Sequence, residues 1–331
     1  MKRILGIGNA LVDVMTLLES DYILREFSLP KGSMQLVDLE KSEGIKEATN
    51  IFPRKRASGG SAANTIHGLA MLGIETGFIG SIGKDETGDF FENDMKKAGV
   101  NTLLIRRDSV TGTAVALITS DTERTFATHL GAAVELTGAD LKPELFDGYD
   151  ILYLEGYLIS DYNLVETACR YAKEKGMEIA LDLASYNIVE TYLVQYKKII
   201  SEYVDILFAN EQEAYEFTGY ERDKALPMMA QLCNTVILKT GAEGSLVSHG
   251  NSFTKISPFP VKCADTTGAG DLYASGFLYG HSIGLGIETC GMIGSLMASR
   301  VIELVGARME PEIFREIKKD IAGLIKSNSK K

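Results

Sequence analysis

The chain has few cysteines and no long apolar run, and each shortage excludes a class of protein. Its four cysteines lie far apart and form no CxxC pair: Cys169, Cys233, Cys263 and Cys290. This spacing indicates buried thiols in a reducing, cytoplasmic compartment and argues against a cysteine metal site. No run of about 20 apolar residues is present, so no segment is expected to span a membrane.

Basic residues are also in short supply. Lys and Arg number 34 against 45 Asp and Glu, which gives the 331 residues a formal net charge of −11. This balance argues against nucleic acid or an anionic membrane as the main partner. The histidines show no metal-ligand spacing, so the sequence gives no sign of a zinc site; they are His67, His129, His249 and His281.

Two common nucleotide-binding signatures are missing as well. The chain has no GxxxxGK[ST] motif, which excludes a Walker-type NTPase. Gly6-Ile7-Gly8 resembles the start of a dinucleotide fingerprint, but Leu11 stands where the third Gly is needed. An NAD-dependent oxidoreductase is therefore disfavoured. The same N-terminal residues are expected to form the first core strand and not a signal peptide.

Short apolar segments alternate with helical patterns along most of the chain. This alternation predicts an α/β fold, a mainly parallel sheet flanked by helices on both faces. Such sheets bind ligands outside the carboxyl ends of their strands. The expected strands cover residues 3–8, 76–82, 151–154, 178–181, 206–209 and 235–239, and the main helices cover 61–72, 86–98, 163–175, 272–283, 286–303 and 311–326.

Residues 14–57 and 101–130 break this alternation. They contain short alternating pieces around 34–37, 102–106, 113–119 and 124–128, which predict a small antiparallel sheet. We expect this sheet to form a β lid over an α/β core of residues 1–13, 58–100 and 131–331. Lids exclude water from phosphoryl transfer, although a plain edge extension of the main sheet fits the pattern equally well.

The most informative stretch runs from Asp265 to Asp271, Asp-Thr-Thr-Gly-Ala-Gly-Asp, and leads into a helix of small residues. Small residues let the backbone aim several N–H groups at one point, which is also the positive end of the helix. Such a point suits an anion, yet Asp271 lies beside it. A base that deprotonates a nucleophile while the N–H groups hold a phosphoryl group explains both. An ordinary acidic first turn of a helix is the alternative.

Three further segments suit a polar ligand. In the turn from Ser58 to Asn64, the backbone and the Asn64 amide could contact the hydroxyls of a ligand. Asn210 and Glu213 face one side of the first turn of a helix, where carboxylates can hold Mg²⁺ through water. Lys239-Thr-Gly-Ala-Glu-Gly244 forms a tight turn that is either a hairpin or a clearing for a nucleotide. Capping and turn formation alone explain each of these segments taken singly.

Taken together, these motifs resemble one family. Asp13, Gly59-Gly60 with Asn64, Asn210-xx-Glu213, the turn at 239–244 and the stretch at 265–271 occur in the order and approximate spacing of the ribokinase-like (PfkB) carbohydrate and nucleoside kinases. The resemblance covers nearly the whole chain. Within the family the N-terminal half is most similar to adenosine kinase, through residues 8–13, 33–36, 111–114, Arg124 and 131–133.

The resemblance implies a role for individual residues. Asp271 would be the general base, with Gly268, Ala269 and Gly270 as the anion hole. The sugar hydroxyls would be held by Asp13, Gly60 and Asn64, and the same substrate site would include Gln35. Tyr157 follows Gly156, where an aromatic of adenosine kinases stacks on adenine; Glu155 and Leu158 beside it have no evident purine role.

The resemblance also implies two cofactors, ATP and Mg²⁺, and a monovalent cation such as K⁺. ATP would lie beside Lys239, Gly241 and Gly244, and Arg124 of the lid would approach its phosphates. Asn210 and Glu213 would organise Mg²⁺ through water. Asp265 and Thr267, with backbone near Val301 and Gly306, would bind the monovalent cation.

The expected activity is ATP- and Mg²⁺-dependent phosphorylation of the primary hydroxyl of a ribonucleoside or furanose sugar. Ribose, fructose, a keto-deoxy sugar acid, inosine and guanosine are alternative acceptors. A sugar- or nucleoside-binding regulator that has lost catalysis is an alternative of another class, against which the intact stretch 265–271 argues. The expected partner is a small molecule, and the protein would be a monomer or a homodimer that pairs through exposed strand edges of the lid.

Overall fold

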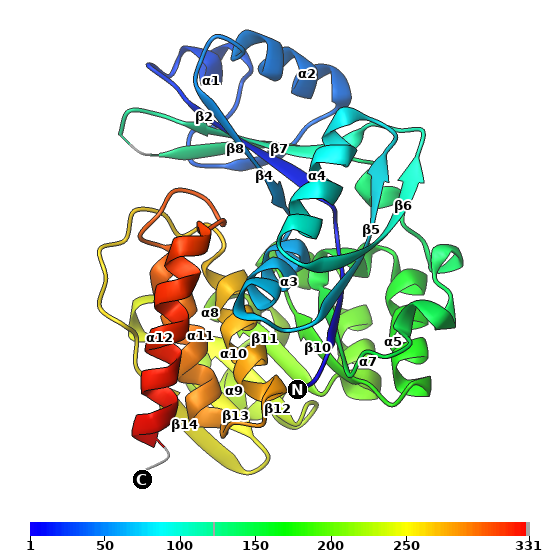
Figure 1. Ribbon diagram of the computed structural model, residues 1–331, viewed down its shortest axis with the longest axis vertical. Coiled ribbons are helices and arrows are strands. Elements are labelled where there is room, and N and C mark those ends of the chain that lie inside the picture. Colours follow the sequence, from blue (N-terminus) through cyan, green and yellow to red (C-terminus); the bar gives the residue numbers. More distant parts are fainter. Residues whose placement is uncertain (122, 329–331) are drawn as a thin grey trace.

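Two β-sheets organise the chain, and the computed structural model describes residues 1–121 and 123–328 (Figure 1). Thr122 and residues 329–331, which fall inside the ranges predicted for the lid and the core, lie outside the described residues. The larger sheet has nine strands in the order β14-β13-β12-β11-β10-β9-β1-β5-β6. They are β1 (Ile4–Ile7), β5 (Thr76–Gly83), β6 (Val100–Arg107), β9 (Ile151–Glu155), β10 (Glu178–Asp182), β11 (Ile206–Asn210), β12 (Thr235–Lys239), β13 (Ser245–His249) and β14 (Ser252–Ile256).

The larger sheet is mainly parallel, as the sequence predicts. All neighbouring strands from β12 to β6 pair in parallel, and β13 and β14 extend this sheet as an antiparallel edge. Its central strands are continuous apolar runs, because both faces are covered: all residues of β1 and β9 are buried.

Helices cover both faces of the large sheet and form two separate cores. Ile4 and Phe78 point to a core shared with α3, α4, α10 and α11, whereas Leu5 and Leu152 point to a core shared with α5, α7, α8 and α9. This alternation follows the two-residue period of a strand. The helices are α3 (Ser61–Leu72), α4 (Glu86–Lys97), α5 (Tyr162–Glu174), α6 (Tyr186–Thr191), α7 (Leu193–Tyr203), α8 (Glu211–Thr218), α9 (Arg222–Met229), α10 (Ala269–Ser282), α11 (Ile287–Val301) and α12 (Pro311–Asn328).

The smaller sheet forms the lid, which lies at the top of Figure 1. Its five strands run in the order β3-β8-β7-β2-β4, and α1 and α2 cover its outer face (Figure 1). These elements are β2 (Leu11–Leu17), α1 (Tyr22–Glu26), β3 (Met34–Leu36), α2 (Leu39–Ala48), β4 (Arg54–Gly59), β7 (Thr111–Ile118) and β8 (Arg124–Gly131).

Two details of the predicted lid are wrong. The lid sheet is mixed and not antiparallel, because β2 pairs in parallel with β7 and β3 in parallel with β8. The strand expected at 102–106 belongs to the large sheet, where β6 pairs in parallel with β5. The cause is the helix α4 between them: a strand, a helix and a second strand form a right-handed crossover that returns the chain to the same sheet. The lid strands β2 and β4 also extend to residues 11 and 59, inside the ranges predicted for the core.

The register of the lid strands sets which side chains face the body. Asp13 pairs with Ala114, Ala114 with Thr128, and Thr128 with Leu36. Directly paired residues share a face, so these four residues form one row, called here the inner row. Their neighbours along the strands, such as Val12, belong to the opposite face, which packs into the apolar core with α1 and α2.

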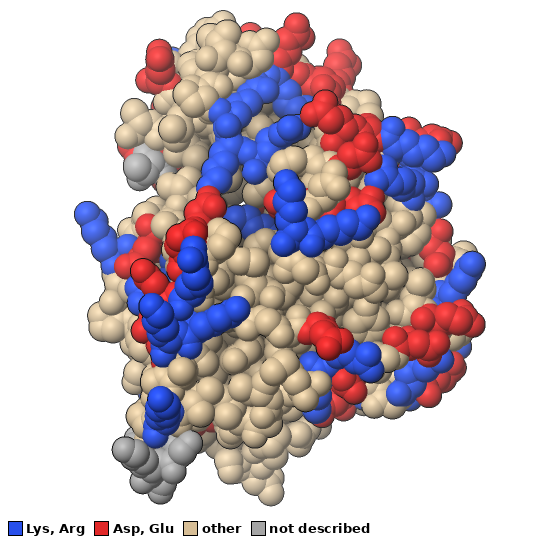
Figure 2. Space-filling model, viewed as in Figure 1, with Lys and Arg blue, Asp and Glu red and all other residues tan. Residues whose placement is uncertain are grey.

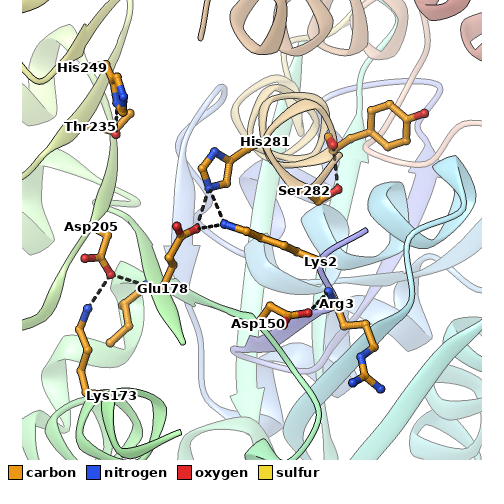
Figure 3. A network of polar contacts seen from close by, with 12 residues as sticks. Lys2, Arg3, Asp150, Lys173, Glu178, Asp205, Thr235, His249, His281 and Ser282 are labelled. Atoms are coloured by element: carbon orange, nitrogen blue, oxygen red, sulfur yellow. Dashed lines mark hydrogen bonds and ion pairs between the residues drawn. The ribbon is translucent and has the colours of Figure 1, made fainter. Parts of the chain in front are cut away.

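A polar network fixes the opposite edge of the large sheet, at the amino-terminal ends of its strands (Figure 3). Glu178 accepts from the Lys2 ammonium at 2.8 Å and lies 2.6 Å from His281 Nε2, and the backbone N–H of Arg3 donates to Asp150 at 2.7 Å. These contacts tie the start of β1 to the end of α10, far from the lid. Within residues 1–121 and 123–328 no helix is long and apolar enough to cross a membrane.

Candidate active site

The candidate site lies between the lid and the carboxyl-terminal edge of the large sheet. In Figure 1, β1 runs from the N-terminus up to the lid, so the polar residues that follow the parallel strands lie beneath the lid sheet. Residues at this edge come from β9, β10, β11 and β12 and from the loop that leads into α10. This is the edge at which parallel sheets bind their ligands.

Asp271 is the central acid of the site. It lies in the first turn of α10 and accepts hydrogen bonds from Ser61 Oγ at 2.7 Å and from Asn64 Nδ2 at 2.9 Å. Both donors lie in the first turn of α3, which packs against α10 so closely that a Cβ on Gly68 would lie 2.5 Å from Ser275 Oγ. Burial raises the pKa of Asp271 to about 6.

The turn before α10 is shaped for close approach. Gly268 has φ +76°, and a Cβ there would lie 2.5 Å from that of Ala307, so only glycine fits. The N–H groups in the first turn of α10 have no intrahelical carbonyl to bind, and the helix dipole makes this end positive. Lys239 Nζ lies beside Gly270, 3.1 Å from the position of an added Cβ. The geometry suits a phosphoryl group held next to Asp271.

A second glycine turn lies against Asp13. Gly60 has φ +100°, and a Cβ there would lie 2.1 Å from the carbonyl oxygen of Asn9; glycine is therefore required at this position. A Cβ on Gly59 would meet Asp13 Oδ1 at 2.3 Å. Burial raises the pKa of Asp13 to about 6, and the positive charge of Arg308 opposes that rise. Asn64 donates its N–H to the carbonyl of Gly60 at 2.8 Å, so Asp13, Gly60 and Asn64 lie close together; hydroxyl recognition by them stays a prediction.

Arg308 is part of the site that the sequence did not reveal. Its Nε and Nη2 donate to the carbonyl oxygen and hydroxyl of Ser58, both at 2.7 Å. Asp94 holds the same Ser58 from the other side, through its N–H at 3.0 Å and its hydroxyl at 2.6 Å. Arg308 and Asp94 therefore clamp the strand end that becomes the Gly59-Gly60 turn. Arg308 is a single charged residue without a motif, so only its place beside Gly306-Ala307 marks it in sequence.

Glu155 is a second positioning residue, whose role the sequence left unassigned. Its carboxylate is buried and accepts from the N–H and amide of Asn9 at 2.9 and 2.6 Å and from the N–H of Ala62 at 2.9 Å. It thereby joins the end of β1 to the start of α3. Burial raises the pKa of Glu155 to about 7, against the effect of these hydrogen bonds.

The predicted Mg²⁺ residues form a capping box at the start of α8. Asn210 donates to both oxygens of Glu213, at 2.7 and 2.6 Å, and accepts from its N–H at 2.9 Å. No group of His, Cys, Asp or Glu in residues 1–121 and 123–328 is arranged to bind a metal directly. Burial and the charge of Asp182 raise the pKa of Glu213 to about 7, whereas Lys239 lowers it. A hydrated cation would relieve this repulsion, so the residues fit Mg²⁺ held through water.

Lys239 and the following glycines lie at the end of β12. Lys239 Nζ forms a buried ion pair with Asp182 at 2.8 Å, which holds the ammonium near the anion-binding turn. The α-carbon of Gly241 faces open space, whereas a Cβ on Gly244 would lie 2.1 Å from the carbonyl oxygen of Ile256. Gly241 is thus accessible to a nucleotide, and Gly244 is fixed by packing.

Basic side chains also gather where the lid meets the body on the face shown in Figure 2. Strand β4, at one edge of the lid sheet, begins with exposed Arg54, Lys55 and Arg56. Lys55 pairs with Glu310 at 2.9 Å and Arg56 lies 3.5 Å from Glu86, so part of this charge is compensated. The excess attracts anions to a chain that is acidic overall.

Two predicted substrate residues lie apart from the inner row. Gln35 pairs with Ala127, on the lid face that packs against the helices, so Leu36 and not Gln35 shares a face with Asp13. Tyr157 lies in the 3-10 turn η4 (Gly156–Ser160), and burial together with the charge of Glu155 raises its pKa well above the usual value. Its surroundings include the site carboxylates, and its stacking on a base stays a prediction.

Arg124 and the predicted cation ligands lie together. The Arg124 guanidinium forms an ion pair with Asp265 and donates to Thr267 Oγ1 at 2.9 Å. The oxygens assigned by resemblance to a monovalent cation thus bind a lid side chain in this chain. Arg124 is positioned at the loop that leads into α10.

Comparison with known proteins identifies the family. The model of the pfkB family of carbohydrate kinases matches residues 34–313. The chain belongs to the PfkB family. Its fold is therefore ribokinase-like, and its chemistry is transfer of a phosphoryl group to an alcohol.

Individual relatives of this PfkB kinase differ in substrate. It is 30% identical to adenosine kinase of Saccharomyces cerevisiae over 324 residues, which cover 91% of this chain and 94% of the yeast protein. It is 28% identical to 5-dehydro-2-deoxygluconokinase of Bacillus licheniformis, over 84% of this chain and 90% of that protein. The crystal structure of adenosine kinase from Sinorhizobium meliloti superposes with a TM-score of 0.87 at 32% identity, over 96% of this chain and 99% of that chain.

The raised pKa of Asp271 predicts an acid limb in the activity of this PfkB kinase. The base role predicted for Asp271 requires an ionised carboxylate, so kcat/KM is expected to fall as pH drops below about 6, by about tenfold per pH unit. Burial also raises the pKa of Asp13 to about 6 and that of Glu155 to about 7, and protonation of these carboxylates is expected to steepen the fall. A discontinuous assay of product between pH 5 and 8 measures it. A constant kcat/KM down to pH 5 would contradict the assignment of the base.

Proposed function

We propose that the chain transfers the γ-phosphoryl group of ATP, with Mg²⁺, to the primary hydroxyl of an adenosine-like ribonucleoside. One observation carries the choice of acceptor: the inner row of the lid begins at Asp13, beside the glycine turn, and ends at exposed, apolar Leu36. A carboxylate for hydroxyls that continues into an apolar surface matches a ribose attached to a base.

The surface around Leu36 supports this acceptor. A cavity of about 610 Å³ lies there. Its lining includes the apolar side chains of Val110, Leu130 and Val134 and also the carboxylates of Asp38, Asp108 and Glu135. Thr128, in the middle of the inner row, also lines it. A free sugar or sugar acid presents mainly hydroxyl, carbonyl and carboxylate groups and would leave most of the apolar side chains of this lining in contact with water, whereas the faces of a purine are large and apolar.

The proposed reaction needs little from the protein beyond positioning and charge. Asp271 takes the proton of the acceptor hydroxyl as the oxygen attacks the γ-phosphorus, and the bond from that phosphorus to the bridging oxygen of ADP breaks. The proton then passes from Asp271 to water. N–H groups of residues 268–270 and the Lys239 ammonium offset the charge of the transferred group. Asn210 and Glu213 would hold Mg²⁺ through water, and the ion would offset the charge of the ATP phosphates.

An acceptor panel tests the proposal. ATP consumption and product formation are measured with Mg²⁺ and adenosine, inosine, guanosine, ribose, fructose, 2-keto-3-deoxygluconate or 5-dehydro-2-deoxygluconate. We expect kcat/KM for adenosine to exceed that for every free sugar and sugar acid by about tenfold or more. A higher value for a sugar or sugar acid would overturn the nucleoside assignment and leave the phosphoryl-transfer chemistry standing.

Leu36→Asp tests the apolar surface directly. The bound base would cover the new carboxylate and leave it without a partner, which is costly. The KM for adenosine is therefore expected to rise by about tenfold to a hundredfold. The KM for ATP should not change. Ile51→Asp is the matched control, because Ile51 is an exposed lid residue in the turn before β4. Equal adenosine KM values for Leu36→Asp and the control would show that no base contacts this surface.

A further inference from the structure

The loop that positions the anion-binding turn is held from the lid. Arg124 is the first residue of β8, and it reaches across to Asp265 and Thr267, just ahead of Gly268. The side chains of Arg124 and Asp265 are only 11% and 5% exposed. An ion pair this deeply buried is costly to break by removing one partner, because an uncompensated charge remains. The contact thus joins the two sheets of the molecule at the catalytic loop.

Both carboxylate oxygens of Asp265 and the nearby carbonyl of Ile302 have protein donors. Asp265 Oδ1 accepts from the N–H and hydroxyl of Thr267 at 3.0 and 2.8 Å. Asp265 Oδ2 accepts from the N–H of Gly306 at 2.7 Å as well as from Arg124. The nearby carbonyl of Ile302 accepts from the N–H groups of Ala264 and Asp265, at 2.7 and 3.1 Å.

These partners do not fit the monovalent cation that the family resemblance implies. A K⁺ ion needs several oxygens that point at it with free lone pairs, whereas here N–H groups and a guanidinium face the same oxygens. A cation would have to displace Arg124 before Asp265 could bind it. If Arg124 stayed in place, its guanidinium and the bound cation would repel each other in a buried space.

We infer that Arg124 is a positioning residue that acts as the built-in cation of the catalytic loop. Its guanidinium neutralises Asp265, orients Thr267 and thereby fixes the N–H groups of the Gly268–Gly270 turn. Because Arg124 belongs to the lid, the loop is fully organised only when the lid lies over the body. Phosphoryl transfer by this chain is then independent of K⁺. The inference depends on the kinase chemistry of the family and not on the identity of the acceptor.

The central test compares wild type and Arg124→Met in buffers that contain either K⁺ or tetramethylammonium at equal ionic strength. Wild-type kcat is expected to differ by less than about twofold between the buffers. Arg124→Met is expected to lose about 10²-fold in kcat, the usual effect of disturbing an anion hole. K⁺ or guanidinium ion should restore part of that loss, because the variant has the uncompensated carboxylate of Asp265 and a space beside it. Arg56→Met, which removes an exposed lid arginine paired with Glu86, should respond to neither ion.

A second measurement does not need an acceptor. The thermal unfolding midpoint of wild type is expected to be the same in K⁺ and tetramethylammonium, whereas K⁺ should raise that of Arg124→Met. This readout separates failure of the inference from failure of the proposed nucleoside activity. Stabilisation or activation of wild type by millimolar K⁺ would overturn the inference. The inference would also be overturned if the only defect of Arg124→Met were a raised KM for ATP that K⁺ does not relieve. Arg124 would then act on the ATP phosphates alone.

Discussion

Asp271→Asn is expected to lower kcat by about 10²- to 10⁴-fold, the range by which a general base accelerates proton transfer. The amide cannot take the hydroxyl proton, whereas the helix, the anion-binding turn and the acceptor contacts of Asp13 stay in place. The KM values for acceptor and ATP should therefore change little. Steady-state kinetics with a directly quantified product, on variant and wild type prepared side by side, measure the effect.

The same substitution should not unfold the protein. The folded-state pKa of Asp271 is raised to about 6 from 3.8, so the folded state binds the proton more tightly than the unfolded chain. Its ionised form costs stability at neutral pH, roughly 3 kcal/mol, and this cost disappears as pH falls from about 6 towards 3.8. An uncharged Asn avoids this cost, and its amide oxygen can still accept from Ser61 Oγ, as Asp271 Oδ1 does at 2.7 Å. Wild-type turnover in a folded Asp271→Asn would remove Asp271 from the mechanism.

Asp13→Asn is expected to raise the acceptor KM by about 10²-fold. A buried carboxylate that accepts from a pair of hydroxyls makes charge-assisted hydrogen bonds, each contributing about 1.5–3 kcal/mol. The amide keeps one acceptor oxygen and turns a donor towards the second hydroxyl. The KM for ATP should stay at its wild-type value, because the residues proposed to bind Mg²⁺ and ATP lie at the ends of β11 and β12.

Asp21→Asn is the control for this substitution, since Asp21 is a lid carboxylate that pairs at the surface with Lys31, at 3.1 Å. Its kinetics should match wild type. The discriminating quantity is the ratio of the effects on KM and kcat, obtained by varying the acceptor at saturating ATP. If Asp13→Asn lowers kcat and leaves the acceptor KM unchanged, Asp13 does not hold the acceptor hydroxyls.

Sequence patterns identified the body of the fold because its signals are local. Buried parallel strands such as Ile151–Glu155 are continuous apolar runs, and helices such as α4 begin at a capping Asp. The pairing of β6 was missed because strand partners depend on the crossover through α4, which the alternation inside the strand does not encode. The parallel pairs of the lid sheet were missed because the direction of a strand within a sheet also depends on the connections between strands.

The residues of the candidate site were likewise predictable from sequence only where they belong to a local motif. Asp271, Asn64 and Gly60 lie in short glycine turns whose spacing carries the chemistry, and the fold brings them together. Arg308 and Asp94 are single charges from distant segments, and only the folded chain shows that both bind Ser58. Gln35 and Leu36 differ by one position, and strand register decides which of the two shares a face with Asp13.

The central claim is tested most directly by identifying the product. Wild type is incubated with Mg²⁺, ATP and adenosine, and phosphorus NMR with mass spectrometry follows every phosphorylated species. The expected result is adenosine 5′-monophosphate and ADP in equal amounts, with negligible product from Asp271→Asn. Release of ADP and inorganic phosphate without a phosphorylated acceptor, or the same product yield from Asp271→Asn, would contradict the account.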